Sequence, residues 1–177
     1  MRQVITAALL CGGVASAAVG LTSTPTPTAP RAAVPAPAGA FGWPLAPPPA
    51  VARPFDAPAH AYGPGHRGVD LVGAVGQPVL AAGDGVVVFA GPVAGRDVVS
   101  IEHAPGLRTT YEPVRPTVAV GDQVSRGRPI GELEAGHPEC PAQPPGACLH
   151  WGVRQGPTHL DPLRLLGAGR VRLLPWE

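Results

Sequence analysis

Short apolar runs separated by glycine and proline make up most of the chain beyond position 65. Runs of this length between turn residues are typical of strands, so the pattern predicts an antiparallel all-β domain. We expect strands over residues 69–71, 77–81, 86–90, 97–103, 108–113, 117–120, 129–133 and 148–154. We find no convincing helix, although Asp161-Pro162-Leu163 is expected to start one helical turn.

The first 20 residues have the pattern of an export signal. Arg2 provides a positive charge, an apolar stretch begins at Val4, and Ala15-Ser16-Ala17 fits a small-x-small cleavage site. An uncleaved anchor is the alternative, but the stretch is rich in glycine and short for a bilayer span of about 20 residues. We therefore predict a signal peptide over residues 1–20, a secreted, extracytoplasmic protein and no stable membrane span after cleavage.

A tract of threonine, proline and alanine follows over residues 21–40. It has almost no large apolar side chain, so burial cannot offset the entropy that ordering would cost. We expect a disordered linker here and a single folded domain over residues 41–177.

The charge of the chain narrows its possible partners. The formal net charge is +1, whereas a nucleic-acid-binding surface needs clustered basic residues. We expect no nucleic-acid partner, and we expect a monomer.

Cleavage of the signal peptide would remove Cys11 and leave Cys140 and Cys148. An even number of cysteines in an exported protein favours a disulfide. Two alternatives for Cys148 remain open: its thiolate could bind a metal, or it could be a free nucleophile.

Two segments contain the residue types that bind metals. One is Gly65-His66-Arg67-Gly68-Val69-Asp70, and the other is Cys148-Leu149-His150-Trp151-Gly152. Imidazole nitrogens and carboxylate oxygens are good zinc ligands, and three protein ligands with one open position are typical of a catalytic zinc site. His66, Asp70 and His150 would form such a set if the β-core brings the segments together, although each motif alone occurs often by chance.

Residues 63–166 resemble the LytM/lysostaphin family of zinc metallopeptidases. The family's H-x-x-x-D and H-x-H motifs correspond to His66…Asp70 and, in part, to Cys148-Leu149-His150. Its two glycine-rich stretches correspond to residues 76–87 and 121–131. The resemblance implies a compact antiparallel β-core of the duplicated hybrid motif type, Zn²⁺ bound by His66, Asp70 and His150, and cleavage of peptidoglycan peptides.

Two positions depart from the family pattern. Family members that cleave peptides have a histidine at the first position of H-x-H and another in a Y-x-H segment, and these positions are Cys148 and Pro113 here. A general base contributes about 10²–10⁴-fold and an oxyanion donor about 10²–10³-fold to the rate. The resemblance therefore implies a slow enzyme, or alternatively a degenerate zinc-binding module that binds cell wall or regulates another hydrolase. A metal-free adhesive domain is a third possibility.

His103 is the nearest candidate for a substitute catalytic residue. If the hairpin pairs His103 with Thr109, its side chain shares a face with Tyr111 and Pro113, and a one-residue slip to Arg108 sends it to the other face. A structural role in the hairpin is the alternative. We expect Glu112 to point away from Pro113 into solvent, and His137 is a further candidate to overhang the groove.

Overall fold

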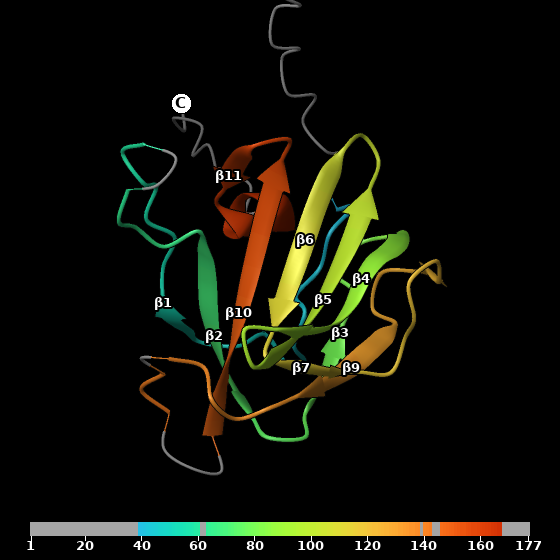
Figure 1. The fold of residues 1–177 in the computed structure, drawn as a ribbon, viewed down its shortest axis with the longest axis horizontal. Helices are drawn as coiled ribbons and strands as arrows, with labels where there is room; N and C mark the ends of the chain where they lie inside the picture. The colour runs from blue at the N-terminus through green and yellow to red at the C-terminus, as the bar shows by residue number, and fades with distance from the viewer. Residues whose placement is uncertain (1–38, 61–62, 139, 143–145, 168–177) are drawn as a thin grey trace, which may run out of the picture. The chain divides into compact units, whose positions relative to one another are not determined.

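Two antiparallel sheets form the structure, a computed structural model that describes residues 39–60, 63–138, 140–142 and 146–167. The larger sheet has the strand order β1-β2-β10-β6-β5-β4-β8, and β11 pairs with β10 (Figure 1). Its strands are β1 (Val51–Arg53), β2 (Gly68–Ala74), β4 (Gly85–Val93), β5 (Arg96–His103), β6 (Leu107–Glu112), β8 (Gln123–Val124), β10 (Gly146–Gln155) and β11 (Thr158–Leu160).

The smaller sheet has the order β3-β9-β7, with β3 at Pro78–Leu80, β7 at Val114–Pro116 and β9 at Pro129–Leu133. A 3-10 helix, η1 (Pro162–Leu166), follows β11. It begins where the Asp161 side chain accepts a hydrogen bond from the Leu163 N–H, as expected for a capping residue. No helix among the described residues has the length and apolar character that a bilayer span requires.

Side-chain alternation separates the two faces of the larger sheet. In β2, β10 and β6 most odd-numbered residues, such as Val69, Trp151 and Tyr111, are fully buried. They join one apolar core with residues of the smaller sheet, including Val79 and Ile130. The even-numbered residues of the same strands lie on the opposite face, because successive side chains of a strand point to opposite sides.

The observed architecture confirms the predicted fold class and most of the predicted strands. The strand expected over residues 117–120 is wrong: β7 lies at Val114–Pro116, and the chain then turns, with the Asp122 carboxylate accepting from the Ala119 N–H. The exposed edge strand β1 was not predicted. The predicted signal peptide and all but the last two residues of the predicted linker lie outside the described residues.

A chain of buried hydrogen bonds crosses the core beneath β5 and β6. His103 Nδ1–H donates to the Asp84 carbonyl at 2.7 Å, and His103 Nε2 lies 2.7 Å from Thr109 Oγ1. Thr109 Oγ1–H donates to the Tyr111 hydroxyl, which also accepts from the Ala82 N–H, both at 2.9 Å. Burial raises the pKa of Tyr111 to about 12, so the phenol stays neutral.

We predict that Tyr111→Phe lowers the free energy of unfolding by about 1–3 kcal/mol, because the buried Ala82 N–H loses its acceptor. Urea denaturation measures this change. Metal affinity should not change, because Tyr111 lies on the core face of the sheet. A variant as stable as the native protein would show that the hydrogen-bond chain is not required for stability.

Candidate metal centre

The register of three adjacent strands places the metal-ligand candidates on one face. Asp70 of β2 is the direct partner of His150 of β10, and His150 is the direct partner of Glu112 of β6. Direct cross-strand partners have Cβ atoms about 4.5–5.5 Å apart. All three residues are even-numbered, so their side chains project from the face of the sheet opposite the core.

His66 reaches the same point from the segment before β2. Its backbone N–H and carbonyl pair with those of Asp56, in an isolated bridge. Its ring Nδ1–H donates to the Pro54 carbonyl at 2.7 Å. Because that nitrogen holds the proton of the neutral ring, Nε2 carries a lone pair and points toward Asp70 and His150.

Three potential ligand atoms converge at this point. His66 Nε2 lies 3.0 Å from Asp70 Oδ1 and 3.1 Å from His150 Nδ1, and His150 Nδ1 lies 2.8 Å from Asp70 Oδ1. His66 and Asp70 are buried, and His150 is partly exposed. The structure thus brings together the three residues that the sequence motifs single out.

The donor set fits a zinc ion. Zinc bonds to nitrogen and oxygen of about 2.0–2.2 Å in a tetrahedron place neighbouring ligand atoms roughly 3.3 Å apart, close to the observed spacing. The lone pair of His66 Nε2 faces the carboxylate of Asp70 without a proton between them, an arrangement that a cation stabilises. An imidazole nitrogen that donates to a carboxylate, as His150 Nδ1 is placed to do, releases that proton when it binds a metal.

The Asp70 carboxylate is held in its charged form. Burial raises the pKa of Asp70, but hydrogen bonds from His137 and His150 outweigh it and hold the pKa well below its usual range. Asp70 is therefore ionised at neutral pH, as a metal-binding carboxylate must be.

Gly68 leaves the space that the His150 ring occupies. A Cβ atom at Gly68 would lie 2.6 Å from His150 Nε2, 2.7 Å from Cε1 and 2.6 Å from the Trp151 carbonyl oxygen. Real Cβ atoms essentially never approach other atoms this closely. Only glycine at this position lets β2 and the ring of His150 lie together.

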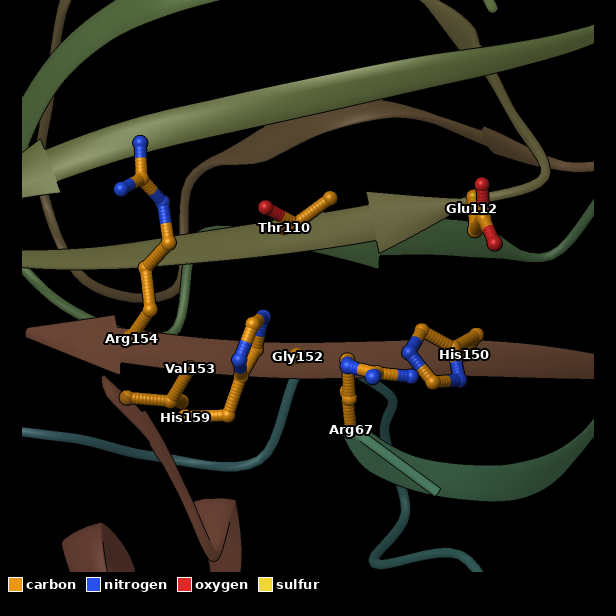
Figure 2. Close-up of a pocket in the computed structure, with 8 residues that line it drawn as sticks. All are labelled: Arg67, Thr110, Glu112, His150, Gly152, Val153, Arg154 and His159. Carbon is orange, nitrogen blue, oxygen red and sulfur yellow. The ribbon is translucent and has the colours of Figure 1, made fainter. Parts of the chain in front are cut away.

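A surface groove begins beside His150. Figure 2 shows Glu112 and His150 at one end of the groove, Arg154 and His159 at the other, and the Arg67 side chain extending toward His150. The open cavity has a volume of about 170 Å³. Burial and the nearby Arg67 and Arg154 lower the pKa of His159, which fits a basic end of the groove.

The structure does not bring His103 to the metal ligands. His103 pairs with Leu107, which differs from both pairings considered from the sequence, and its odd number places it on the core face with Tyr111. It is 3% exposed, and its edge packs against Phe41 at 5.1 Å between ring centroids. Burial lowers the pKa of His103 despite its hydrogen bond to the Asp84 carbonyl. Its burial and hydrogen bonds are those of the structural role that the sequence analysis gave as the alternative.

The two departures from the family pattern have different surroundings. Cys148 is buried on the metal-side face of β10 and forms a disulfide with Cys140, with a Cα–Cα distance of 5.6 Å. This bond excludes Cys148 as a thiolate ligand or nucleophile in this structure. Pro113 is buried just beyond the end of β6.

Two residues at the centre were not singled out correctly from the sequence. Glu112 is not simply solvated: it lines the groove beside His150, and its Oε1 lies 3.7 Å from Arg96 Nη2. The role of Gly68 does not follow from the metal-binding motifs. Its signal is the alternation of His66, Gly68 and Asp70, which places a residue without a side chain beside two ligands.

We predict that Gly68→Ala abolishes stoichiometric metal binding, because the new Cβ atom displaces the His150 ring. Gly152→Ala is the matched control, since its Cβ atom would meet the Arg67 carbonyl oxygen at 3.5 Å and His150 Nε2 at 3.7 Å, which are ordinary contacts. Metal analysis of both purified variants measures the effect. Equal metal content in the two variants would contradict the importance of Gly68.

Comparisons with known proteins place this architecture in a family. The description "Peptidase family M23" matches residues 64–162. The chain is 57% identical over 139 residues to the uncharacterized protein Rv2891 of Mycobacterium tuberculosis, an alignment that covers 76% of this chain and 55% of that protein. The chain therefore spans little more than half the length of this relative.

Two solved structures share the fold. A zinc containing peptidase from Vibrio cholerae has a TM-score of 0.57 and 26% identity, covering 73% of this chain and 40% of that chain. The catalytic domain of a variant of the prophage-encoded M23 protein EnpA from Enterococcus faecalis has a TM-score of 0.55 and 25% identity, covering 70% of this chain and 96% of that chain. These findings confirm the resemblance inferred from the motifs. Because the family match covers more than half of its 177 residues, the chain belongs to peptidase family M23.

Proposed function

We propose that this chain is a zinc-dependent peptidase domain that cleaves peptides of peptidoglycan outside the cytoplasm. The observation that carries the proposal is the convergence of three ligand atoms, from His66, Asp70 and His150, within about 3 Å of one another. Membership of peptidase family M23 supports the reaction class. The export-signal pattern of residues 1–20 supports the location.

His66, Asp70 and His150 would hold the zinc ion and leave the side facing the groove open to substrate. When bound, zinc supplies Lewis acidity, which polarises a peptide carbonyl and activates water for attack. The His66–Pro54 hydrogen bond fixes the ring that presents Nε2.

The groove beside His150 suits an extended peptide. Its volume of about 170 Å³ is below the roughly 300–1,000 Å³ typical of pockets that enclose small molecules. The β6 and β10 strands line its floor through Thr110, Gly152 and their neighbours. A peptide lying along these strands would pass His150 and Glu112 at one end.

We assign the role of proton acceptor to Glu112, because the two positions that hold catalytic histidines in the family do not provide an imidazole. The Glu112 carboxylate is a charged group on the same face as His150, directly across from it in the sheet. In this assignment water adds to the peptide carbonyl carbon, its proton moves to Glu112, and Glu112 returns a proton to the departing amine nitrogen as the C–N bond breaks. His103 is unsuited to the role because it lies on the other face.

A second function is a module that binds cell-wall peptides without cleaving them, or that regulates another hydrolase. Cys148, which forms a disulfide, and Pro113 favour this second function, because the family has catalytic histidines at these two positions. This function retains the metal site and the groove but needs no proton acceptor.

We predict that the full chain binds one zinc ion and releases new products from purified muropeptides, and that a chelator stops the reaction. His150→Ala should lose the zinc. Glu112→Gln should retain zinc and lose about 10²–10⁴-fold in rate, because the amide cannot accept the proton. Metal analysis and chromatography of the muropeptides give both readouts.

The outcomes separate the two functions. A native chain that binds zinc and muropeptides but forms no product would contradict the peptidase function and support the binding module. In that case Pro113→His combined with Cys148→His and Cys140→Ala should create turnover. Absence of stoichiometric zinc in the native chain would contradict both functions.

A further inference from the structure

His137 lies against the metal-ligand cluster although no regular element carries it. It follows β9 in the segment that leads to Cys140. Its Nε2 lies 3.1 Å from Asp70 Oδ2, the carboxylate oxygen that does not face His66 and His150. Each oxygen of Asp70 thus has its own direction: Oδ1 toward the cluster and Oδ2 toward His137.

His137 also covers a second ligand. Its ring stacks on the ring of His150, with centroids 5.7 Å apart and an interplanar angle of 27°. Its side chain is only 9% exposed, although the residue lies in a loop. The ring therefore shields two of the three ligands from solvent.

The hydrogen bond fixes the state of the His137 ring. Because Asp70 is a charged acceptor, His137 Nε2–H is the donor. The other nitrogen, Nδ1, is buried and has no hydrogen-bond partner among the described residues. His137 therefore contacts the metal centre only through Asp70. Its nitrogens are not among the ligand atoms of His66, Asp70 and His150 that converge on one point.

The disulfide explains how a loop residue is held there. Cys140 is three residues after His137, and Cys148 is two residues before His150 on the same face of β10. The bond ties the segment that carries His137 to the strand that carries His150. Without it, ordering this segment over the ligands would cost more backbone entropy.

We propose that His137 is a positioning residue of the metal centre, and that the Cys140–Cys148 disulfide acts on zinc binding by holding His137 against Asp70. The inference rests on the proposed zinc site. The hydrogen bond orients the carboxylate so that Oδ1 faces His66 and His150, where the ion would bind, and the stacked ring limits movement of His150. Outer partners of this kind change metal affinity by about 10–100-fold when removed.

The test uses the full, oxidised chain and zinc alone, with affinity measured by competition against a chromophoric chelator. His137→Ala should weaken zinc binding about 10–100-fold. His137→Gln, whose amide N–H can still donate to Asp70, should recover most of the affinity. His137→Phe keeps a stacked ring without a donor and should remain weak. The exposed His60 provides the control: His60→Ala should bind zinc like the native chain.

Cobalt substitution gives a second readout that a purely structural role would not alter. The visible absorption of bound Co²⁺ should change in His137→Ala and return toward the native spectrum in His137→Gln, because it reports how Asp70 coordinates the ion. Thermal unfolding of the metal-free variants checks that their folds are intact.

A double-mutant cycle tests the role of the disulfide. Cys140→Ala with Cys148→Ala should weaken zinc binding by about the same factor as His137→Ala, and the triple variant should be no weaker, because both changes remove one interaction. Multiplicative losses would overturn the coupling.

Native-like zinc affinity and cobalt spectrum in His137→Ala would overturn the role of His137, and strong binding by His137→Phe would overturn the role of its hydrogen bond. Failure of the native chain itself to bind zinc is a different result, because it refutes the proposed function before any variant is compared.

Discussion

The structure depends on the strand register that brings three potential metal-ligand atoms, from His66, Asp70 and His150, within about 3 Å of one another. His66 Nε2 and Asp70 Oδ1 are 3.0 Å apart. The β2–β10 register fixes Asp70 opposite His150, and the Asp56 bridge fixes His66 beside them. The packed core on the other face of the same strands prevents these elements from separating, since interiors of this kind deform little.

This member of peptidase family M23 differs from the family pattern in the residues that surround the candidate metal ligands. A disulfide-bonded cysteine, Cys148, stands two residues before His150, where the family pattern has a histidine, and the carboxylate of Glu112 lies across from His150 in the groove. A loop imidazole, His137, contacts Asp70 from outside. The proposed chemistry therefore combines the family's metal ligands with a different set of neighbours.

The sequence predicted the elements better than their pairing. Glycine and proline mark the ends of short strands, so β2, β5, β9 and β10 were expected near their observed positions. The edge strand β1 follows three prolines and lacks an apolar run, so the pattern of apolar residues does not predict it. Over residues 117–120, where a strand was expected, the chain instead turns around Asp122.

The sequence predicts only those site residues that lie in recognisable motifs. His66, Asp70 and His150 stand in recognisable patterns, whereas Glu112 becomes a neighbour of His150 only through the β6–β10 register, and His137 becomes a neighbour of Asp70 only through the disulfide-bound loop. The face on which the His103 side chain lies depends on the β5–β6 register, because a shift of one residue moves every side chain of a strand to the other face. Such long-range pairing is decided by the packing of the whole sheet, which no local pattern specifies.

X-ray absorption spectroscopy of the zinc-loaded chain tests the central claim most directly. The account predicts one zinc with nitrogen and oxygen neighbours at about 2.0–2.2 Å, two of them imidazoles, and no sulfur. A zinc–sulfur distance near about 2.3 Å would show that Cys148 binds the ion in place of the disulfide, and a spectrum without bound imidazoles would show that His66 and His150 do not share a metal.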